Sequence, residues 1–337
     1  ARRVWRGLAP EGVRRLAQPV LAPMLEAHVR RQARKAHGAD GAAGGPIRIV
    51  GYFEGAHGIA ASAWIFHLNA PEMLAALGQM GPGRLIGPRY GYWAWELPRA
   101  PKHWLADAAM ADEIWVPSRY VAEGLAGARA PVRVVPHPLF LEDYAGVAPA
   151  PRRAEFQAVA LFDFNSSAAR KNPQGAIAAF AQAFGEDAAA RLVLKTQNGA
   201  RHPEALAALR RAAPANVEIV DETWPYGEVK ALIAGSDVLL SLHRAEGFGL
   251  TPAEALALGT PVIATGWSGV TDFLDETVAI LVPSGRTAVE DPQGIYRGQA
   301  WAAPDIAFSA QALRELRANP ERRQALAAAG RRRVAER

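Results

Sequence analysis

Short apolar runs rich in β-branched residues alternate with Ala- and Leu-rich helical stretches along most of the chain. Nearly continuous apolar strands that are separated by helices are typical of parallel sheets covered on both faces. The pattern therefore predicts the α/β class, with doubly wound, Rossmann-like parallel sheets. The runs that predict strands are 47–53, 114–116, 132–135, 158–162, 192–194, 217–220, 238–242, 262–264 and 279–282.

Two features divide the chain into three parts. Residues 1–45 read as a helical arm, which three prolines interrupt and a Gly- and Ala-rich linker follows. A loop-like stretch at 138–153 separates two α/β segments. A chain of 337 residues is long enough for two domains of roughly 150 residues. We therefore expect a first domain over 46–146 and a second over 147–318.

Composition and charge exclude several classes of protein. The chain has no cysteine, which excludes disulfides, thiolate zinc sites and cysteine nucleophiles. Its net charge is +5, but residues 1–37 hold nine basic and two acidic side chains, so the remainder carries −2 and no nucleic acid partner is indicated. No apolar run approaches the roughly 20 residues of a membrane span. The N-terminus lacks a signal-peptide pattern, so we expect a cytoplasmic protein.

The loops that follow the strands are where ligand-binding residues are expected, because ligands of doubly wound domains bind at the carboxyl ends of the strands. The first such loop is 51–58, which contains His57 and Gly58. Its glycines permit close approach of a ligand to the backbone. A tight strand-to-helix turn is the equally good alternative, because the loop does not follow the GxGxxG pattern.

A second loop, at 163–173, predicts a phosphate site. Asn172 is a good N-cap and Pro173 suits the first position of a helix. Arg170 and Lys171 therefore lie beside the positive end of a helix with free backbone N–H groups, where a phosphate would bind. The alternative is a pair of solvated basic residues.

A third loop, 243–249, precedes a predicted short helix with Thr251 as N-cap and Gly259 past its end. Glu254 lies three residues after Thr251, so a capping box is one interpretation of this carboxylate. Glu246 has no such explanation and could accept hydrogen bonds from sugar hydroxyls. The loop glycines leave backbone amides free to face a phosphate.

The third loop opens the block EGFGLTPAEALALGTPVIAT, in which seven residues separate Glu246 from Glu254. Four further blocks go with it: RKNPQGAIAAFAQAF (170–184), DEIWVPSRYVAEGL (112–125), VRVVPHPL (132–139) and GYWAWELP (91–98). Together these blocks resemble the retaining nucleotide-sugar glycosyltransferases of family 4, which have the GT-B fold, and the first block is the most specific of them. The resemblance implies two Rossmann-like domains that face a central cleft, with an acceptor side over 46–146 and a donor side over 147–318. It also implies that a C-terminal helix, 319–337, crosses back to the first domain.

The resemblance assigns roles to the donor-side residues. It implies that Glu246 approaches the donor sugar hydroxyls, that Glu254 holds the ribose, and that Lys171 with Arg170 binds the diphosphate. Further donor contacts are expected from the backbone amides of Phe248, Gly249 and Leu250, and from Gly58, Ser166, Trp224 and His243. The family needs no metal and no cofactor. Retention is attributed there to front-face attack without a protein nucleophile.

The chain departs from the family pattern at two places. Many relatives carry an arginine six residues before the lysine, where this chain has Asn165, so Arg170 or Ser166 is expected to complete the phosphate clamp. Many also carry an acceptor-side histidine where this chain has an aromatic turn. Glu96 takes that orienting role, or the turn is simply buried. The other acceptor-side and catalytic candidates in this part of the chain are Trp93, Trp95, His57 and His137.

The expected function is the transfer of a hexose from a GDP- or UDP-linked donor to a glycan or lipid-linked glycan. Cell-surface polysaccharide or lipopolysaccharide synthesis in a bacterium is the expected context. The arm at 1–37 would rest on an anionic membrane surface, or be a solvated arm or oligomer contact. The alternatives are a non-catalytic sugar-nucleotide scaffold and a GT-B epimerase or phosphorylase. A phosphorylase would need a lysine for its pyridoxal cofactor, for which Lys195 is the candidate.

Overall fold

The structure is a computed structural model that describes most of the chain after residue 62. The described residues are 29–30, 47–50, 63–81, 85, 87–151, 155–292 and 294–336, with only the backbone of 47–50. Most of the predicted arm and linker at 1–45 lies outside them. His57 and Gly58 also lie outside the described residues, so the roles expected of them stay predictions.

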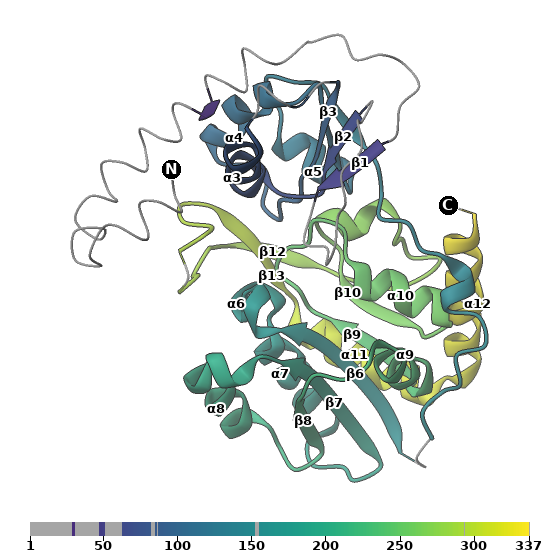
Figure 1. The fold of residues 1–337 in the computed structure, drawn as a ribbon. Coiled ribbons are helices and arrows are strands. Elements are labelled where there is room, and N and C mark those ends of the chain that lie inside the picture. Colours follow the sequence, from purple (N-terminus) through teal and green to yellow (C-terminus); the bar gives the residue numbers. More distant parts are fainter. Residues whose placement is uncertain are drawn as a thin grey trace. The chain divides into compact units, whose positions relative to one another are not determined.

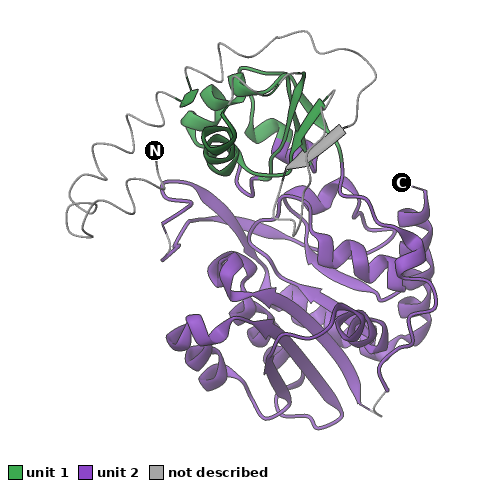
Figure 2. Cartoon of the chain, viewed as in Figure 1, with its two compact units in different colours: residues 1–94, 99–116, 122–135 green, residues 95–98, 117–121, 136–337 purple. Residues whose placement is uncertain are grey.

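The chain divides into two compact units, which Figure 2 distinguishes by colour. Unit 1 comprises residues 1–94, 99–116 and 122–135, and unit 2 comprises residues 95–98, 117–121 and 136–337. The second unit therefore includes two short segments from the earlier part of the chain, which hold Glu96 and Ser118. It also includes residues 136–146, which the sequence analysis assigns to the first domain.

Unit 1 is built on a sheet of five parallel strands. The strands are β1 (Ile47–Val50), β2 (Ala63–Phe66), β3 (Arg89–Tyr92), β4 (Glu113–Val116) and β5 (Val132–Val134), and they follow one another across the sheet in chain order. Its helices include α3 (Ala70–Met80) and α4 (Lys102–Asp107), and α5 (Arg119–Gly124) begins in unit 2 and ends in unit 1. The apolar runs of the sequence predict β1, β4 and β5 but not β2 or β3. Strand β3 reads Arg-Tyr-Gly-Tyr, and its arginine is 1% exposed, so it offers no apolar run to recognise.

Unit 2 has a six-stranded parallel sheet whose strand order reverses once. The order is β11-β10-β9-β6-β7-β8, so the chain moves outward from β6 to β8 and then returns to β9 on the other side. This reversal is the doubly wound arrangement expected from the sequence, and it places a topological switch point between β6 and β9. The strands are β6 (Phe156–Asp163), β7 (Ala190–Gln197), β8 (Val217–Asp221), β9 (Val238–Ser241), β10 (Val262–Thr265) and β11 (Ile280–Val282).

Helices cover both faces of this sheet (Figure 1). Successive side chains of a strand point to opposite faces, so β6 sends Ala158 into one core and Val159 into the other. The first core is closed by α7 (Pro173–Phe184), α8 (Pro203–Ala212) and α11 (Ile306–Ala318). The second is closed by α9 (Tyr226–Gly235), α10 (Leu250–Leu258) and the end of α12 (Pro320–Ala335). Burial on both faces explains why these strands read as continuous apolar runs.

The last helix, α12, packs against α10 inside unit 2. Gly330 lies against Leu256, and the guanidinium of Arg331 donates to the carbonyl of Leu258 over 2.7 Å. The expectation that residues 319–337 return to the first domain stays a prediction, because these contacts concern unit 2 alone.

Between the last strand of this sheet, β11, and helix α11, the chain forms a separate antiparallel hairpin. It consists of β12 (Ser284–Ala288) and β13 (Ala300–Pro304), which pair with each other and not with the six-stranded sheet. The sequence analysis does not predict it, because its strands are short and rich in alanine and polar residues.

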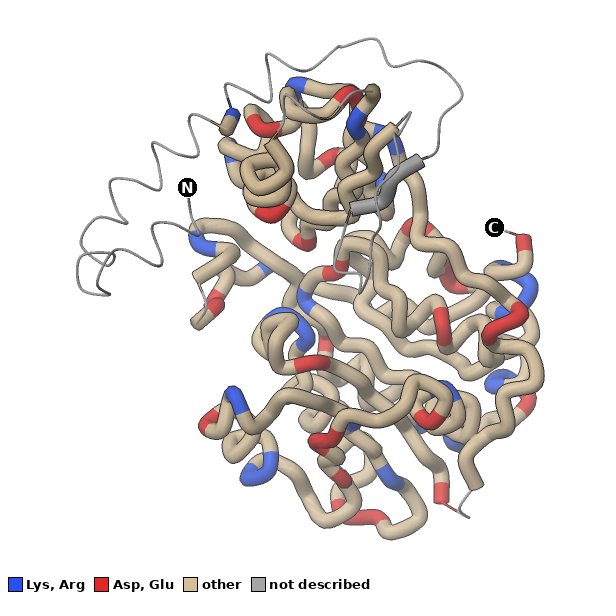
Figure 3. Tube along the Cα trace, viewed as in Figure 1, with Lys and Arg blue, Asp and Glu red and all other residues tan. Residues whose placement is uncertain are grey.

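Charge and hydropathy add two observations on the described residues. Acidic and basic residues are interspersed over the trace of unit 2 (Figure 3), in keeping with the near-neutral balance outside residues 1–37. Among the described helices, none combines the length and the apolar character that crossing a bilayer requires.

Candidate functional site

The switch point of unit 2 brings together the loops that follow β6 and β9. The backbone amide of Arg244 donates to the carbonyl of Arg170 over 2.7 Å. The side-chain amide of Asn172 donates to the carbonyl of Leu242 over 2.9 Å. Asn172 also accepts from the amide of Gly175 and so caps α7, which confirms the helix start predicted from the sequence. These contacts fix α6 (Ala168–Lys171), with its two basic residues, against the second loop.

A buried ion cluster lies at the centre of this arrangement. The ammonium of Lys171 donates to Oε1 of Glu246 over 2.5 Å, and Nη1 of Arg170 donates to Oε2 over 3.2 Å. The Arg170 guanidinium also donates to the carbonyls of Ala245 and Ser166, over 2.8 and 3.0 Å. The Arg170 side chain is 5% exposed, whereas Lys171 is 21% exposed. Lys171 is therefore the cation of the two that solvent, or a ligand, can reach more readily.

The protonation states of the cluster follow from its charges. Burial alone would raise the pKa of Glu246, but the charges of Lys171 and Arg170 chiefly outweigh it and hold that pKa at about 2. Burial lowers the pKa of Arg170, and Glu246 with Glu96 more than reverses the effect, so the net shift is upward. Glu246 is thus a carboxylate and Arg170 a guanidinium at every physiological pH.

Glu96 joins the same cluster from one of the short segments of unit 2. Its Oε1 lies 3.8 Å from Nη2 of Arg170, and its Oε2 accepts from the hydroxyl of Tyr296 over 2.9 Å. The structure thus places Glu96 beside the residues that the sequence analysis assigns to the donor site. Tyr296 is a residue that the sequence analysis missed, since no motif surrounds it.

Helix α10 begins two residues earlier than predicted, with Gly249 and not Thr251 at its N-cap. The capping-box interpretation of Glu254 is therefore wrong. Gly249 has φ 95° and faces the side chain of Val270, a combination that favours glycine. No side chain caps this end of the helix, so the first amides, including that of Leu250, lack an intrahelical partner. Free amides at the N-terminal end of a helix can bind an anion, and this end of the nine-residue helix follows Glu246 closely in the chain.

The backbone of Phe248 belongs to the loop before α10, and its side chain packs in the core of unit 2. The ring lies 5.2 Å from that of Phe273 and 5.2 Å from the imidazole of His137. His137 is therefore a neighbour of the site loop and packs edge-on against it, from a segment that belongs to unit 2.

Glu254 faces two tyrosines that the sequence analysis did not identify. The hydroxyl of Tyr226 donates to its Oε1, and the hydroxyl of Tyr144 lies 3.5 Å from the same oxygen. Burial raises the pKa of Glu254, and the two tyrosine hydrogen bonds partly offset the rise. Lys230 lies over both rings, with its ammonium 5.4 Å from the centre of Tyr144 and 4.9 Å from that of Tyr226. Glu254 is therefore a buried carboxylate with hydroxyl donors at one oxygen.

His243 is buried between two hydrogen-bonding partners. Its Nε2 lies 3.4 Å from the carbonyl of Trp267, which can only accept, so Nε2 carries the proton. Its Nδ1 accepts from the hydroxyl of Ser241 over 3.0 Å. Burial lowers the pKa of His243 to about 4, so the ring is neutral at pH 7. It supports the loop and does not add a charge to the cluster.

Ser166 and Trp224 lie in loops at the carboxyl ends of the strands. The hydroxyl of Ser166 donates to the carbonyl of Asp163 over 2.9 Å, and its own carbonyl holds Arg170. The indole of Trp224 donates to Glu222 over 2.8 Å, and the ammonium of Lys195 lies 4.8 Å from its ring centre. Lys195 also donates to the carbonyls of Thr196 and Glu222, and burial lowers its pKa.

Two of the acceptor-side candidates are buried aromatic residues. Trp93 is fully buried in unit 1, with its ring centre 5.8 Å from that of Trp104. Trp95 is 4% exposed in unit 2 and packs on Tyr296, with 5.3 Å between ring centres. These positions favour the buried-turn interpretation of the two tryptophans, while Glu96, between Trp95 and Leu97, keeps a polar role.

Among the described residues, no cluster of three or more His, Asp or Glu side chains is suited to a metal ion.

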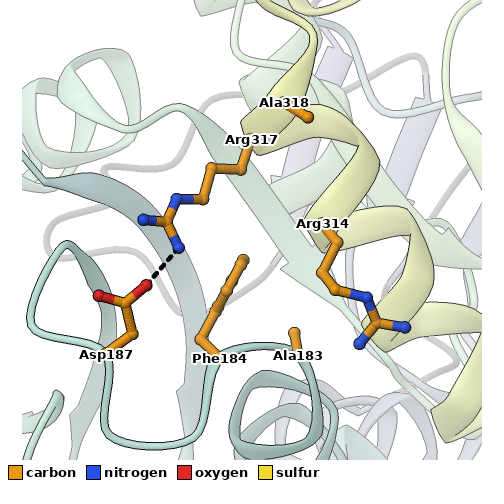
Figure 4. Close-up of a pocket in the computed structure, with 6 residues that line it drawn as sticks. All are labelled: Ala183, Phe184, Asp187, Arg314, Arg317 and Ala318. Atoms are coloured by element: carbon orange, nitrogen blue, oxygen red, sulfur yellow. Dashed lines mark hydrogen bonds and ion pairs between the residues drawn. The ribbon is translucent and has the colours of Figure 1, made fainter.

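A cavity of about 430 Å³ lies apart from this site and opens between α7 and α11 (Figure 4). Arg317 crosses it, pairs with Asp187 over 2.6 Å and stacks on Phe184. None of its lining residues belongs to the ion cluster, to α10 or to the Glu254 group.

Several solved structures share this fold at low sequence identity. TarM of S. aureus aligns with a TM-score of 0.59 and 13% identity over 82% of this chain and 51% of its own. The pneumococcal O-GlcNAc transferase GtfA aligns with a TM-score of 0.57 and 14% identity over 81% and 53%. Sucrose-phosphate synthase from Thermosynechococcus elongatus aligns with a TM-score of 0.60 and 19% identity over 82% and 69%. The chain thus spans about half the length of TarM and GtfA.

The likeness to these structures shows a GT-B fold, as the resemblance implies. No curated protein matches the chain. A family model described as "Family 4 Glycosyltransferase in conflict systems" matches residues 118–337, which are more than half of the chain and include the ion cluster and α10. The chain therefore belongs to the family 4 glycosyltransferases of conflict systems.

Proposed function

We propose that this protein transfers a hexose from a nucleoside-diphosphate donor to a glycan or lipid-linked glycan, with retention and without a metal. The observation that carries the proposal is the buried cluster of Glu246, Lys171 and Arg170 at the N-terminal end of α10. Structural neighbours support the donor class, since GtfA was solved with UDP and GlcNAc, and HepE of Anabaena with UDP and glucose. UDP- and GDP-linked hexoses are the donors to test first.

The diphosphate is best placed between Lys171 and the first amides of α10. A diphosphate leaving group gains negative charge as the glycosidic bond breaks, so donors that are already fixed around it stabilise the transition state. Lys171 is paired with Glu246 before the donor arrives. Binding of a diphosphate would give its ammonium a second, anionic partner and leave Arg170 on the carboxylate.

Glu246 then accepts hydrogen bonds from the hydroxyls of the donor sugar. As a carboxylate with a pKa of about 2, it only accepts hydrogen bonds, and sugar hydroxyls are donors of the matching kind. Front-face attack needs no protein nucleophile: the acceptor oxygen bonds to the anomeric carbon as the bond to the diphosphate oxygen breaks. The acceptor proton passes to that departing oxygen. Glu246 orients the sugar throughout and forms no covalent bond.

Glu254 is best placed to hold the ribose. Two vicinal hydroxyls can donate to one carboxylate, and Tyr226 and Tyr144 already supply hydroxyl donors to Oε1 of Glu254. Its position four residues into α10 puts it beyond the amides that face the diphosphate. The order of contacts along the chain thus follows the order of sugar, diphosphate and ribose in the donor.

The test pairs binding with turnover. Wild-type protein is titrated with UDP, GDP and their hexose conjugates by calorimetry, and sugar transfer to glycan acceptors is followed by mass spectrometry. Glu246→Gln keeps the shape of the side chain but removes its charge. We expect this variant to bind the free nucleotide like the wild type and to lose transfer by about 100-fold or more, as for a group acting in the transition state.

Glu204→Gln is the matched control, because Glu204 is an exposed carboxylate in the first turn of α8. It should leave both binding and transfer unchanged. Donor binding without any transfer would favour the non-catalytic scaffold. Interconversion of the donor sugar without an acceptor would favour the epimerase, and absence of any binding would overturn the proposal.

The same proposal extends to the basic arm at 1–37, which would bring the enzyme to anionic lipid that carries the acceptor. Cosedimentation with phosphatidylglycerol vesicles tests this part. Binding that phosphatidylcholine vesicles do not reproduce, and that salt weakens, is the expected result. Equal behaviour with the two lipids would contradict it.

A further inference from the structure

The hairpin of β12 and β13 makes contacts with the loops of the site. Arg244, in the loop after β9, has its guanidinium 5.7 Å from the ring centre of Trp301 on β13. Arg286 on β12 lies 4.3 Å from the ring centre of Trp267, in the loop after β10. The backbone amide of Ala302 donates to the carbonyl of Arg244 over 2.9 Å. An element outside the sheet is thus fastened to two of its loops.

The segment between β12 and β13 carries Tyr296, and hydrogen bonds within this segment fix the backbone next to it. The carboxylate of Asp291 accepts from the amide of Ile295 over 2.8 Å and lies 3.4 Å from the amide of Tyr296. The amide of Val289 closes the hairpin by donating to the carbonyl of Gln299 over 2.9 Å. Although it lies in a loop, Tyr296 is only 5% exposed, because its ring packs on Trp95. Its neighbour Ile295 is 54% exposed.

Tyr296 reaches the ion cluster through Glu96. Its hydroxyl donates to Oε2 of Glu96 over 2.9 Å, which leaves Oε1 on the side of Arg170, at 3.8 Å. The backbone of Glu96 is held separately, since the hydroxyl of Tyr120 donates to its carbonyl over 3.3 Å. Burial and the neighbouring carboxylate raise the pKa of Tyr296, so its hydroxyl stays a donor. Glu96 is therefore fixed at both its main chain and its side chain.

Arg170 is the group on which this arrangement acts. Its Nη1 is bonded to Glu246 and to the carbonyl of Ala245, and its Nη2 is bonded to the carbonyl of Ser166 and faces Glu96. A Glu96 side chain that was free to turn could place both oxygens on Nη2. This stronger attraction would compete with the bond from Nη1 to Glu246 and so weaken the hold of one of the two cations that orient Glu246.

We propose that Tyr296 is a positioning residue that holds Glu96 and, through Arg170, sets the orientation of Glu246 for sugar transfer. This inference rests on the proposed function. The hydroxyl of Tyr296 is bonded to Glu96, so we expect its removal to affect the transfer step and to leave nucleotide binding intact. The inserted hairpin thereby becomes part of the machinery of the enzyme.

Tyr296→Phe tests the proposal, because it removes the hydroxyl and keeps the ring on Trp95. We expect kcat to fall about tenfold while the Kd for the free nucleotide and the melting temperature stay unchanged. In a Glu96→Ala background, which removes the acceptor, the same substitution should have no further effect, since the two residues act through one contact. Tyr90→Phe in unit 1, where Tyr90 stacks on Trp115, is the matched control and should leave kcat unchanged.

The outcomes separate this inference from the function on which it rests. A Tyr296→Phe variant that transfers sugar at the wild-type rate overturns the positioning role and leaves the proposed function standing. An effect that adds to that of Glu96→Ala, or that accompanies a lowered melting temperature, shows a purely structural role. A wild-type protein that neither binds nor transfers a nucleotide sugar overturns the proposed function and the role of Tyr296 with it.

Discussion

Lys171 and Glu246 lie 75 residues apart in the chain, and their side chains form an ion pair at the switch point of the sheet, with 2.5 Å between Nζ and Oε1. The pair joins the last turn of α6 to the loop before α10. It holds the more exposed of the two cations at the place that we propose for the diphosphate. The carboxylate is also paired with Arg170, so it would not be left unpaired if Lys171 turned to a ligand.

Lys171→Ala should weaken the binding of UDP or GDP by about 10- to 100-fold, the usual effect of losing charge-assisted hydrogen bonds. The loss should be smaller for the nucleoside without its phosphates, because the ammonium serves the anion alone. Calorimetric titration of the nucleotide and of the nucleoside measures both. Lys102→Ala is the matched control, since Lys102 is exposed in unit 1. Equal losses for nucleotide and nucleoside would contradict a phosphate role.

Tyr226→Phe should make nucleotide binding depend on pH over a higher range. Burial raises the pKa of Glu254, and the hydroxyl of Tyr226 partly offsets that rise. Removing the hydroxyl therefore raises the pKa further, and a protonated Glu254 accepts fewer hydrogen bonds from a ribose. The midpoint of the acid limb in a plot of Kd against pH should move upward, with little change at pH 8. An acid limb that stays in place would argue against Glu254 as a ribose ligand.

The fold was largely predictable because most strands are buried on both faces. In β6 every residue but Gln157 and Asp163 is apolar, and in β9 every residue but Ser241, so their sequences identify them without any alternation. Strand β3 was not predictable, because it contains the buried charged residue Arg89, and a charged residue interrupts the apolar pattern by which a buried strand is recognised. The hairpin of β12 and β13 was missed for another reason. It is held by contacts with Arg244 and Trp267, which lie elsewhere in the chain, and its own sequence has no pattern that predicts these contacts.

The site was predictable where a motif lies in one stretch of chain, and not where it is assembled in space. The spacing of Glu246 and Glu254 is visible in the sequence, and so is the basic pair before Asn172. The partners of these carboxylates, Tyr226 and Tyr296, come from distant elements that carry no motif. A tyrosine becomes a hydrogen-bond donor to a particular carboxylate only through the tertiary fold, so these contacts needed the structure.

His243 should make the protein less stable as the pH falls from about 6.5 toward 4. Its pKa is about 4 in the folded protein against 6.5 ordinarily, so between these values the unfolded chain binds a proton that the folded protein does not. The stability is therefore complete above pH 6.5, and about 3 kcal/mol of it is lost by pH 4, at about 1.4 kcal/mol for each pKa unit. Glu246, with its pKa of about 2, stays charged across this window.

Urea unfolding at half-unit steps of pH measures this loss. His243→Gln, which keeps an N–H donor for the carbonyl of Trp267, should flatten the curve between pH 6.5 and 4 relative to the wild type. His103→Gln is the control, because His103 is exposed on α4. A His243→Gln curve with the wild-type slope would show that other groups cause the acid sensitivity.

Gly269→Ala should disturb the site without touching any polar side chain. The amide of Gly269 donates to the carbonyl of Glu246 over 2.9 Å, and a methyl group on Gly269 would run into the backbone of Gly247. Backbone atoms of a packed loop cannot move aside cheaply, so the loop that carries Glu246 must shift. We expect a loss of about 1–3 kcal/mol in stability, as for other overpacking substitutions. Sugar transfer should fall further than this loss explains, since the carboxylate moves relative to Lys171 and Arg170.

Gly285→Ala provides the comparison, because a methyl group there meets no described atom within 4 Å. Urea unfolding gives the stability of both variants, and transfer is then measured where each is fully folded. A folded Gly269→Ala variant with wild-type turnover would mean that the position of Glu246 tolerates such a shift. The charge cluster would then act through its net electrostatics, and the fixed geometry inferred for Glu246, and with it the role of Tyr296, would have to be abandoned.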